Sequence, residues 1–235
     1  MTNLFPLRLF LSRPFRMCIF SAIISGMLFP SLSFGAAPAY PLKRLSQLSV
    51  PILGLTLNED NQVSGIVTHV MIIFYERQDH YGLNIRFGAL PGRFSPLAQE
   101  AVHQAILRAA KAAQLDSKSW TVFLTFPYRG LTMYGDSLSA MIGLSVLALA
   151  KGESIIYGRS LTGTITEEGN IGRVGGIPQK ILAAHSKQLE RVLIPEEYDI
   201  GDGDWETPFL MHISPVGTVS QAYFALTGQA LFSSG

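Results

Sequence analysis

The chain has 235 residues, with 18 lysines and arginines against 17 aspartates and glutamates, so its formal net charge is +1 at pH 7. This balance gives no reason to expect nucleic acid as a partner. The length can bury one sizeable core, and we therefore expect one domain.

The first 35 residues predict a secretory signal peptide. They carry three arginines and no acidic residue, then an apolar run over residues 17–34, then small residues. We expect cleavage after Gly35, which would leave 15 basic residues against 17 acidic ones and export the protein to the periplasm or beyond the cell. The alternative is an uncleaved membrane anchor, because the span without charge continues to Leu42 and is followed by Lys43 and Arg44.

Cysteine and histidine usage disfavours several classes of site. The single cysteine, Cys18, lies within the leader, so the mature chain would have no disulfide, no thiol nucleophile and no cysteine metal ligand. The five histidines show no H-x-x-x-H or H-E-x-x-H spacing, so we predict no metal and no cofactor. The mature chain lacks G-x-S-x-G, which argues against a Ser-His-Asp hydrolase.

The mature chain begins with a segment of weak periodicity. Residues 36–57 are rich in Pro, Ala, Ser and Leu and are predicted as a linker, so the domain is expected to span residues 58–235. Residues 62–75 and 83–90 are rich in β-branched and aromatic side chains, and they predict a β-hairpin around a charged turn.

A mixed α+β order with one βαβ-like core is expected for the rest of the domain. A helix should begin with Ser95 as its cap and Pro96 as its first residue, and continue through Leu115. The elements expected after it are strand 119–126, helix 138–150, strand 154–157, hairpin 161–174, helix 178–188, strand 191–195, strand 209–213 and helix 218–226.

Ser137 and Lys180 are the candidate catalytic residues. A serine at the start of a helix lies near unpaired backbone N–H groups, which favour the negative charge that develops on a carbonyl oxygen during acyl transfer. A lysine acts as a general base only when neutral, which requires burial to lower its pKa from about 10.4. On local chemistry alone, a helix cap and a solvated lysine are the ordinary interpretations.

Two longer segments resemble the Lon protease family. Residues 135–152, GDSLSAMIGLSVLALAKG, are similar to that family's serine helix, D-G-P-S-A-G followed by an apolar helix that ends T-G. Residues 161–195, LTGTITEEGNIGRVGGIPQKILAAHSKQLERVLIP, follow the family pattern without a gap. The resemblance implies an α+β proteolytic domain of the ribosomal protein S5 domain 2-like class, with Ser137 as nucleophile, Lys180 as base and Thr162 orienting the lysine.

The chain departs from the family pattern at four positions. Asp136 stands where the family has proline, Tyr134 where it often has an acid, Thr164 where it has glutamate and Thr125 where many members have histidine. We expect these positions to line the approach to the serine, so the departures bear on substrate preference and rate.

The predicted function is that of an exported, ATP-independent serine endopeptidase that cleaves polypeptides through a Ser137 acyl-enzyme. Members of the resembled family commonly form ring-shaped homo-oligomers. The sequence does not decide whether this protein forms one. Two alternatives remain: a protease-inactive domain kept for binding, and a small-molecule kinase of the related superfold, whose Gly/Ser-rich loop likewise opens a helix.

Overall fold

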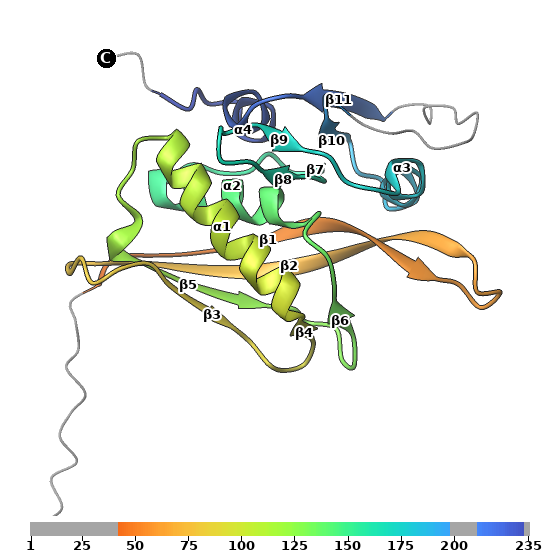
Figure 1. The fold of residues 1–235 in the computed structure, drawn as a ribbon, viewed down its shortest axis with the longest axis horizontal. Helices are drawn as coiled ribbons and strands as arrows, with labels where there is room; N and C mark the ends of the chain where they lie inside the picture. The colour runs from red at the N-terminus through yellow and green to blue at the C-terminus, as the bar shows by residue number, and fades with distance from the viewer. Residues whose placement is uncertain (1–41, 198–210, 233–235) are drawn as a thin grey trace, which may run out of the picture. The chain divides into compact units, whose positions relative to one another are not determined.

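A computed structural model describes residues 42–197 and 211–232 (Figure 1). The predicted signal peptide over residues 1–35 lies outside the described residues, as does the beginning of the strand predicted at 209–213. Helices and strands alternate irregularly along the described chain, so the predicted mixed α+β class is confirmed. No helix in this part of the chain is long and apolar enough to span a bilayer.

The described chain begins with a long antiparallel hairpin of β1 (Leu42–Leu57) and β2 (Val63–Arg77). The prediction of a linker over residues 36–57 is therefore wrong for residues 42–57. Alternate residues of β1, such as Val50 and Ile52, are buried, which is the period-2 pattern of a strand with one covered face. Pro51 obscured that pattern, yet proline is tolerated here because β1 is an edge strand.

The hairpin belongs to a four-stranded sheet with the order β1-β2-β5-β3, where β3 is Asn84–Phe87 and β5 is Trp120–Thr125. The predicted pairing of residues 62–75 with residues 83–90 is wrong, because β5 lies between β2 and β3. Strand β3 runs parallel to β5, and α1 (Pro96–Ala112) provides the crossover that a parallel pair requires.

Two helices cover one face of this sheet (Figure 1). Helix α1 begins as predicted, since the Ala98 backbone N–H donates to Ser95 Oγ at 3.2 Å. Helix α2 (Ser139–Lys151) is buried along most of its length and ends at Gly152, whose φ is 75°. Together the helices and the sheet enclose the larger apolar core.

A second sheet contains three parallel strands in the order β11-β10-β7. Its strands are β7 (Arg159–Leu161), β10 (Arg191–Pro195) and β11 (His212–Val216). Helix α3 (Ile177–Ser186) connects β7 to β10, which confirms the βαβ-like core, and α4 (Val219–Thr227) follows β11.

Shorter elements connect these parts. The strand predicted at residues 154–157 is wrong: β7 begins at Arg159, after Gly158 turns the chain with a φ of 74°. The predicted hairpin near residues 161–174 is confirmed in a shorter form. The remaining elements are β4 (Arg93–Phe94), the 3₁₀ helix η1 (Ser117–Ser119), β6 (Thr132–Met133), β8 (Thr164–Ile165) and β9 (Ile171–Gly172).

A smaller apolar core joins α3 to the β1–β2 hairpin. Its central residues are Leu53 of β1, Val67 of β2, and Ile177 and Ile181 of α3. The close fit requires Gly65 in β2, since a Cβ atom there would lie 1.9 Å from the Gln179 carbonyl oxygen. This packing fixes the first turn of α3 beside β1, where the candidate site lies.

Candidate active site

Lys180 lies in the first turn of α3. Gly176 precedes the helix with φ 68° and ψ 34°, a left-handed conformation that favours glycine. The Lys180 backbone N–H donates to the Gly176 carbonyl oxygen at 3.1 Å. Pro178 is the second helical residue, one later than predicted. This turn directs the lysine into the protein, where its exposed fraction is 3%.

The Lys180 amine is held by Thr162, the residue that directly follows β7. Lys180 Nζ donates to Thr162 Oγ1 at 3.1 Å, and Thr162 is fully buried. Burial removes water from the ammonium group and lowers the pKa of Lys180 from 10.5 to about 8, while the negative charge of Asp136 acts in the opposite direction. The amine can therefore exist in its neutral form near physiological pH.

Ser137 lies in the turn before α2 and is bound there through its backbone. Its carbonyl oxygen accepts hydrogen bonds from the Gly163 N–H at 2.8 Å and from Thr162 Oγ1 at 3.5 Å. The Ala140 N–H donates in return to the Gly163 carbonyl oxygen at 3.1 Å. Thr162 thus contacts both candidate residues, the lysine by its amine and the serine by its carbonyl group.

The Ser137 hydroxyl is not used as a helix cap. Helix α2 begins at Ser139 with Leu138 in the cap position and no side-chain cap hydrogen bond. The first helical N–H groups bind backbone carbonyls instead, and that of Ser139 donates to Asp136 at 2.9 Å. Helix capping, the ordinary role of a serine at the start of a helix, is therefore not the role of Ser137.

Ser137 and Lys180 line one cavity of about 500 Å³. Most of the lining comes from residues 52–56 of β1, residues 131–138 before and at the start of α2, and residues 174–176 before α3. Within the described residues no hydrogen bond joins Lys180 Nζ to Ser137 Oγ, and the two residues are connected through Thr162. In unliganded hydrolases such catalytic hydrogen bonds are often long and shorten when substrate binds.

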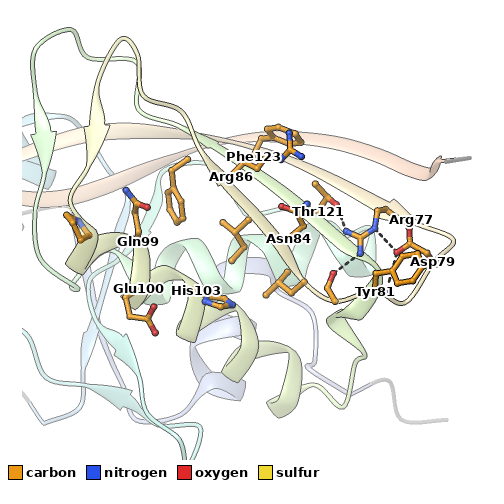
Figure 2. A pocket seen from close by; sticks show the side chains of 15 residues that line it. Arg77, Asp79, Tyr81, Asn84, Arg86, Gln99, Glu100, His103, Thr121 and Phe123 are labelled. Atoms are coloured by element: carbon orange, nitrogen blue, oxygen red, sulfur yellow. Dashed lines mark hydrogen bonds and ion pairs between the residues drawn. The ribbon is translucent and has the colours of Figure 1, made fainter. Parts of the chain in front are cut away.

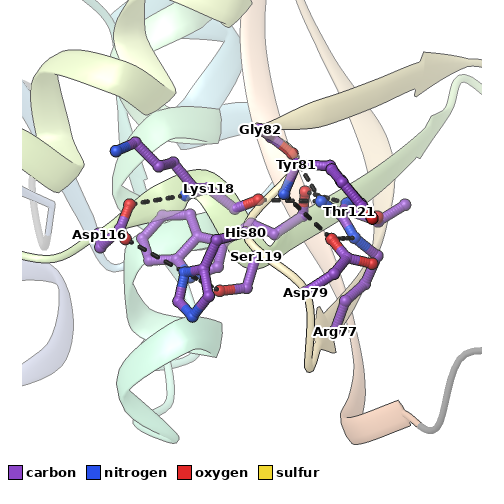
Figure 3. A network of polar contacts seen from close by, with 10 residues as sticks. Arg77, Asp79, His80, Tyr81, Gly82, Asp116, Lys118, Ser119 and Thr121 are labelled. Carbon is purple, nitrogen blue, oxygen red and sulfur yellow. Dashed lines mark hydrogen bonds and ion pairs between the residues drawn. The ribbon is translucent and has the colours of Figure 1, made fainter.

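A larger cavity of about 900 Å³ lies along β3 and α1, away from these residues (Figure 2). The guanidinium group of Arg77 at its edge is engaged in structural contacts with Asp79 and with the carbonyl oxygens of Gly82, Lys118 and Trp120 (Figure 3). This arginine holds the turns at the ends of β2 and β5 together, so its charge is already neutralised. We regard the smaller cavity as the candidate site because it contains the serine and the lysine.

One arrangement near this network resembles a catalytic triad but cannot act as one. Ser119 Oγ lies 3.4 Å from His80 Nδ1, and Asp116 Oδ2 lies 3.3 Å from the same nitrogen (Figure 3). A triad needs the serine and the carboxylate on opposite ring nitrogens. Ser119 is also buried, so its hydroxyl has no access to substrate.

The sequence did not reveal the β1 wall of the cavity. Residues 52–56 line the cavity, yet they fell within the predicted linker. The alternation of Leu48, Val50 and Ile52 was the signal that could have identified this strand. Among the described residues, no group of three His, Cys, Asp or Glu side chains is placed to hold a metal ion.

Comparison with known proteins gives matches to Lon proteases. Residues 95–204 match the model of the Lon protease (S16) C-terminal proteolytic domain. The chain is 34% identical over 118 residues to the Lon protease homolog 2, peroxisomal, of Xenopus laevis, covering 46% of this chain and 14% of the relative. It is 32% identical over 108 residues to the Archaeal Lon protease of Archaeoglobus fulgidus, covering 45% and 17%.

A longer alignment has lower identity. The chain is 21% identical over 171 residues to the Lon protease of Methanosphaera stadtmanae, covering 72% of this chain. The chain spans 14–20% of the length of these three relatives. The region matched by the family model contains Ser137, Thr162 and Lys180.

Proposed function

We propose that the protein is a serine endopeptidase with a Ser137–Lys180 dyad, and the match of residues 95–204 to the Lon protease (S16) C-terminal proteolytic domain supports this proposal. The observation that carries the proposal is that Ser137 and Lys180 line one cavity, and that Thr162 holds the buried Lys180 amine and also binds the Ser137 backbone. The ribosomal protein S5 domain 2-like class is part of this proposal.

The chemistry requires Lys180 to be neutral when substrate binds. Its amine takes the proton from Ser137 Oγ as this oxygen attacks the peptide carbonyl carbon, forming a tetrahedral intermediate. When the C–N bond breaks, the ammonium returns that proton to the leaving amine and an acyl-enzyme remains. Water then attacks the ester with Lys180 again as base, which releases the acid product and restores the Ser137 hydroxyl.

The developing oxyanion needs N–H donors close to Ser137. The N–H groups of Ser139 and Ala140 already donate to the carbonyl oxygens of Asp136 and Gly163. The N–H groups of Ser137 and Leu138 make no hydrogen bond with any described residue, and they lie beside the nucleophile. We assign the oxyanion to these two amides, which places it just before α2 and not within its first turn.

The outer edge of β1 offers a place for an extended substrate. The Pro51 carbonyl oxygen accepts a hydrogen bond from Ser160 Oγ of β7 at 2.8 Å, which shows that this oxygen points away from β2. The register with β2 is unbroken beyond this point, so Leu53 and Leu55 direct their backbone groups to the same side. Both residues line the cavity. A peptide added to this edge would extend β1 and pass in front of Ser137.

We propose further that the enzyme acts outside the cytoplasm and without ATP, on flexible or unfolded polypeptides. The described elements begin at Leu42, so cleavage of the leader after Gly35 would leave each of them intact. If cleavage does not depend on ATP, the enzyme can cut only those segments that enter the cavity in extended form.

The test is cleavage of an unfolded protein such as casein by the purified mature chain. The wild-type protein should cleave casein at the same rate with and without ATP. Ser137→Ala and Lys180→Met should each abolish cleavage, while circular dichroism spectra remain those of the wild type. The matched control is Ser139→Ala, which removes the next hydroxyl along the chain and should retain cleavage.

Casein cleavage that persists in Ser137→Ala would refute the dyad. A folded wild-type protein that cleaves no polypeptide would favour the binding-domain alternative, and nucleotide-dependent phosphoryl transfer would favour the kinase.

A further inference from the structure

Asp136 places a carboxylate beside the nucleophile. It directly precedes Ser137, is exposed, and lines the cavity that contains Ser137 and Lys180. Its backbone carbonyl oxygen accepts from the Ser139 N–H, which fixes the turn. Its side chain makes no hydrogen bond or ion pair with any described residue. The carboxylate is therefore free to interact with a group that enters the cavity.

Among the described residues that line the cavity, Asp136 is the one with a negative charge. The lining residues contributed by β1 and β2 are apolar or neutral, and Leu55 is a typical member. Lys180 is the other charged group among the described lining residues, and it must be neutral to act as base. Tyr134, which is 76% exposed, adds an aromatic ring of the kind that stabilises a cation.

On this charge distribution we propose that Asp136 is a specificity-determining residue that selects substrates with a lysine or arginine side chain next to the scissile bond. The inference rests on the proposed protease function. When Lys180 is neutral, the described lining of the cavity has a net charge of −1, so a cationic substrate side chain is attracted and an acidic one is repelled. Position 136 is proline in the family pattern, so this selection would be particular to the present chain.

Asp136 could instead serve only as a counter-ion of Lys180. Its charge acts on that amine and raises the amine's pKa, against the effect of burial. A counter-ion alone would change the rates for all substrates by one common factor. A selecting carboxylate changes the ratio of rates between substrates, and this ratio separates the two roles.

The experiment measures kcat/KM for matched peptides in which one residue, placed from three positions before to three positions after the scissile bond, is Lys, Gln or Glu. The wild-type enzyme should prefer Lys over Gln by about tenfold at one or two adjacent positions, and Glu should be the poorest. Asp136→Asn should reduce the Lys-to-Gln ratio to about one. Asp136→Glu should restore most of the preference, and 0.5 M salt should weaken it in the wild type.

Asp60→Asn is the matched control, because it removes one exposed carboxylate outside the cavity lining and should keep the wild-type ratio. Equal cleavage of Lys and Gln peptides by the wild type would overturn the inference while leaving the protease function in place. A Lys preference that persists in Asp136→Asn would also overturn it. Absence of cleavage of every peptide and of casein by the wild type would instead refute the protease function.

Discussion

At the scale of single residues, the site depends on one lysine that is buried without a direct carboxylate partner. Thr162 accepts a hydrogen bond from Lys180 Nζ, and no ion pair joins Lys180 to any described residue. Burial opposes the charged form, and the neutral form is the one that can take a proton from serine. This cause was expected from the sequence, since a lysine that acts as a base requires burial to lower its pKa.

The pH dependence of kcat/KM should report this lysine. Because the pKa of Lys180 is lowered to about 8 and the neutral amine is the base, activity should rise with pH and level off above pH 8. At pH 6 it should be about 100-fold below the plateau. Asp136→Asn removes a charge that raises this pKa, so the inflection should move to lower pH. An inflection near pH 6.5 that is unchanged in Asp136→Asn would point to histidine and contradict the assignment.

Thr162 should act as a positioning residue. Thr162→Val keeps the shape of the side chain but removes the acceptor for Lys180 Nζ, so kcat should fall about 10- to 100-fold with little change in KM. Thr162→Ser retains the hydroxyl and should recover most of the activity. Steady-state kinetics with one peptide substrate would measure both variants, and equal losses in the two would show that the threonine acts through packing alone.

At the scale of elements, the site forms where three segments distant in sequence meet. The turn before α2 is bound to Gly163, β1 provides one wall, and α3 delivers Lys180. The junction of β1 with α3 depends on Gly176, where a Cβ atom would lie 2.5 Å from Leu55 Cδ1. Gly176 also has a positive φ, and this is the constraint that favours glycine, because Leu55 is exposed and the end of its side chain can shift.

Gly176→Ala should therefore lower the free energy of unfolding by about 1–3 kcal/mol and reduce activity by displacing the first turn of α3. Gly175→Ala is the matched control, because a Cβ atom there meets no neighbour within 4 Å and its φ is not positive. Urea denaturation of the two variants gives the comparison. An equal loss of stability in both would contradict the account of this junction.

At the scale of the whole molecule, the sequence predicted the segments with strong local signals. Helix α1 was identified from the Ser95-Pro96 start, and α2 from its apolar run and terminal glycine. The pairing of β3 with β5 could not be predicted, because a strand's partner depends on contacts between distant residues. Strand β1 was missed since Pro51 and the serines obscured its alternation. The serine, threonine and lysine came from a resemblance. The structure places the serine and the lysine in one cavity, and Thr162 is hydrogen-bonded to both residues.

Processing of the leader is a prediction about the full chain. If residues 1–35 are a signal peptide, intact mass of the protein recovered from the periplasm or the medium should correspond to a chain that begins at Ala36. The cleavage-site variant Gly35→Pro should accumulate in the membrane fraction at full length. Recovery of a full-length wild-type chain from the membrane would favour the anchor.

The most direct test of the dyad is covalent labelling of the mature protein with a fluorophosphonate probe, followed by peptide mapping by mass spectrometry. The account predicts a single adduct on Ser137 that forms faster as the pH rises through 8 and is lost in Lys180→Met. Labelling of Ser137 that persists unchanged in Lys180→Met, or labelling of a different serine, would contradict it.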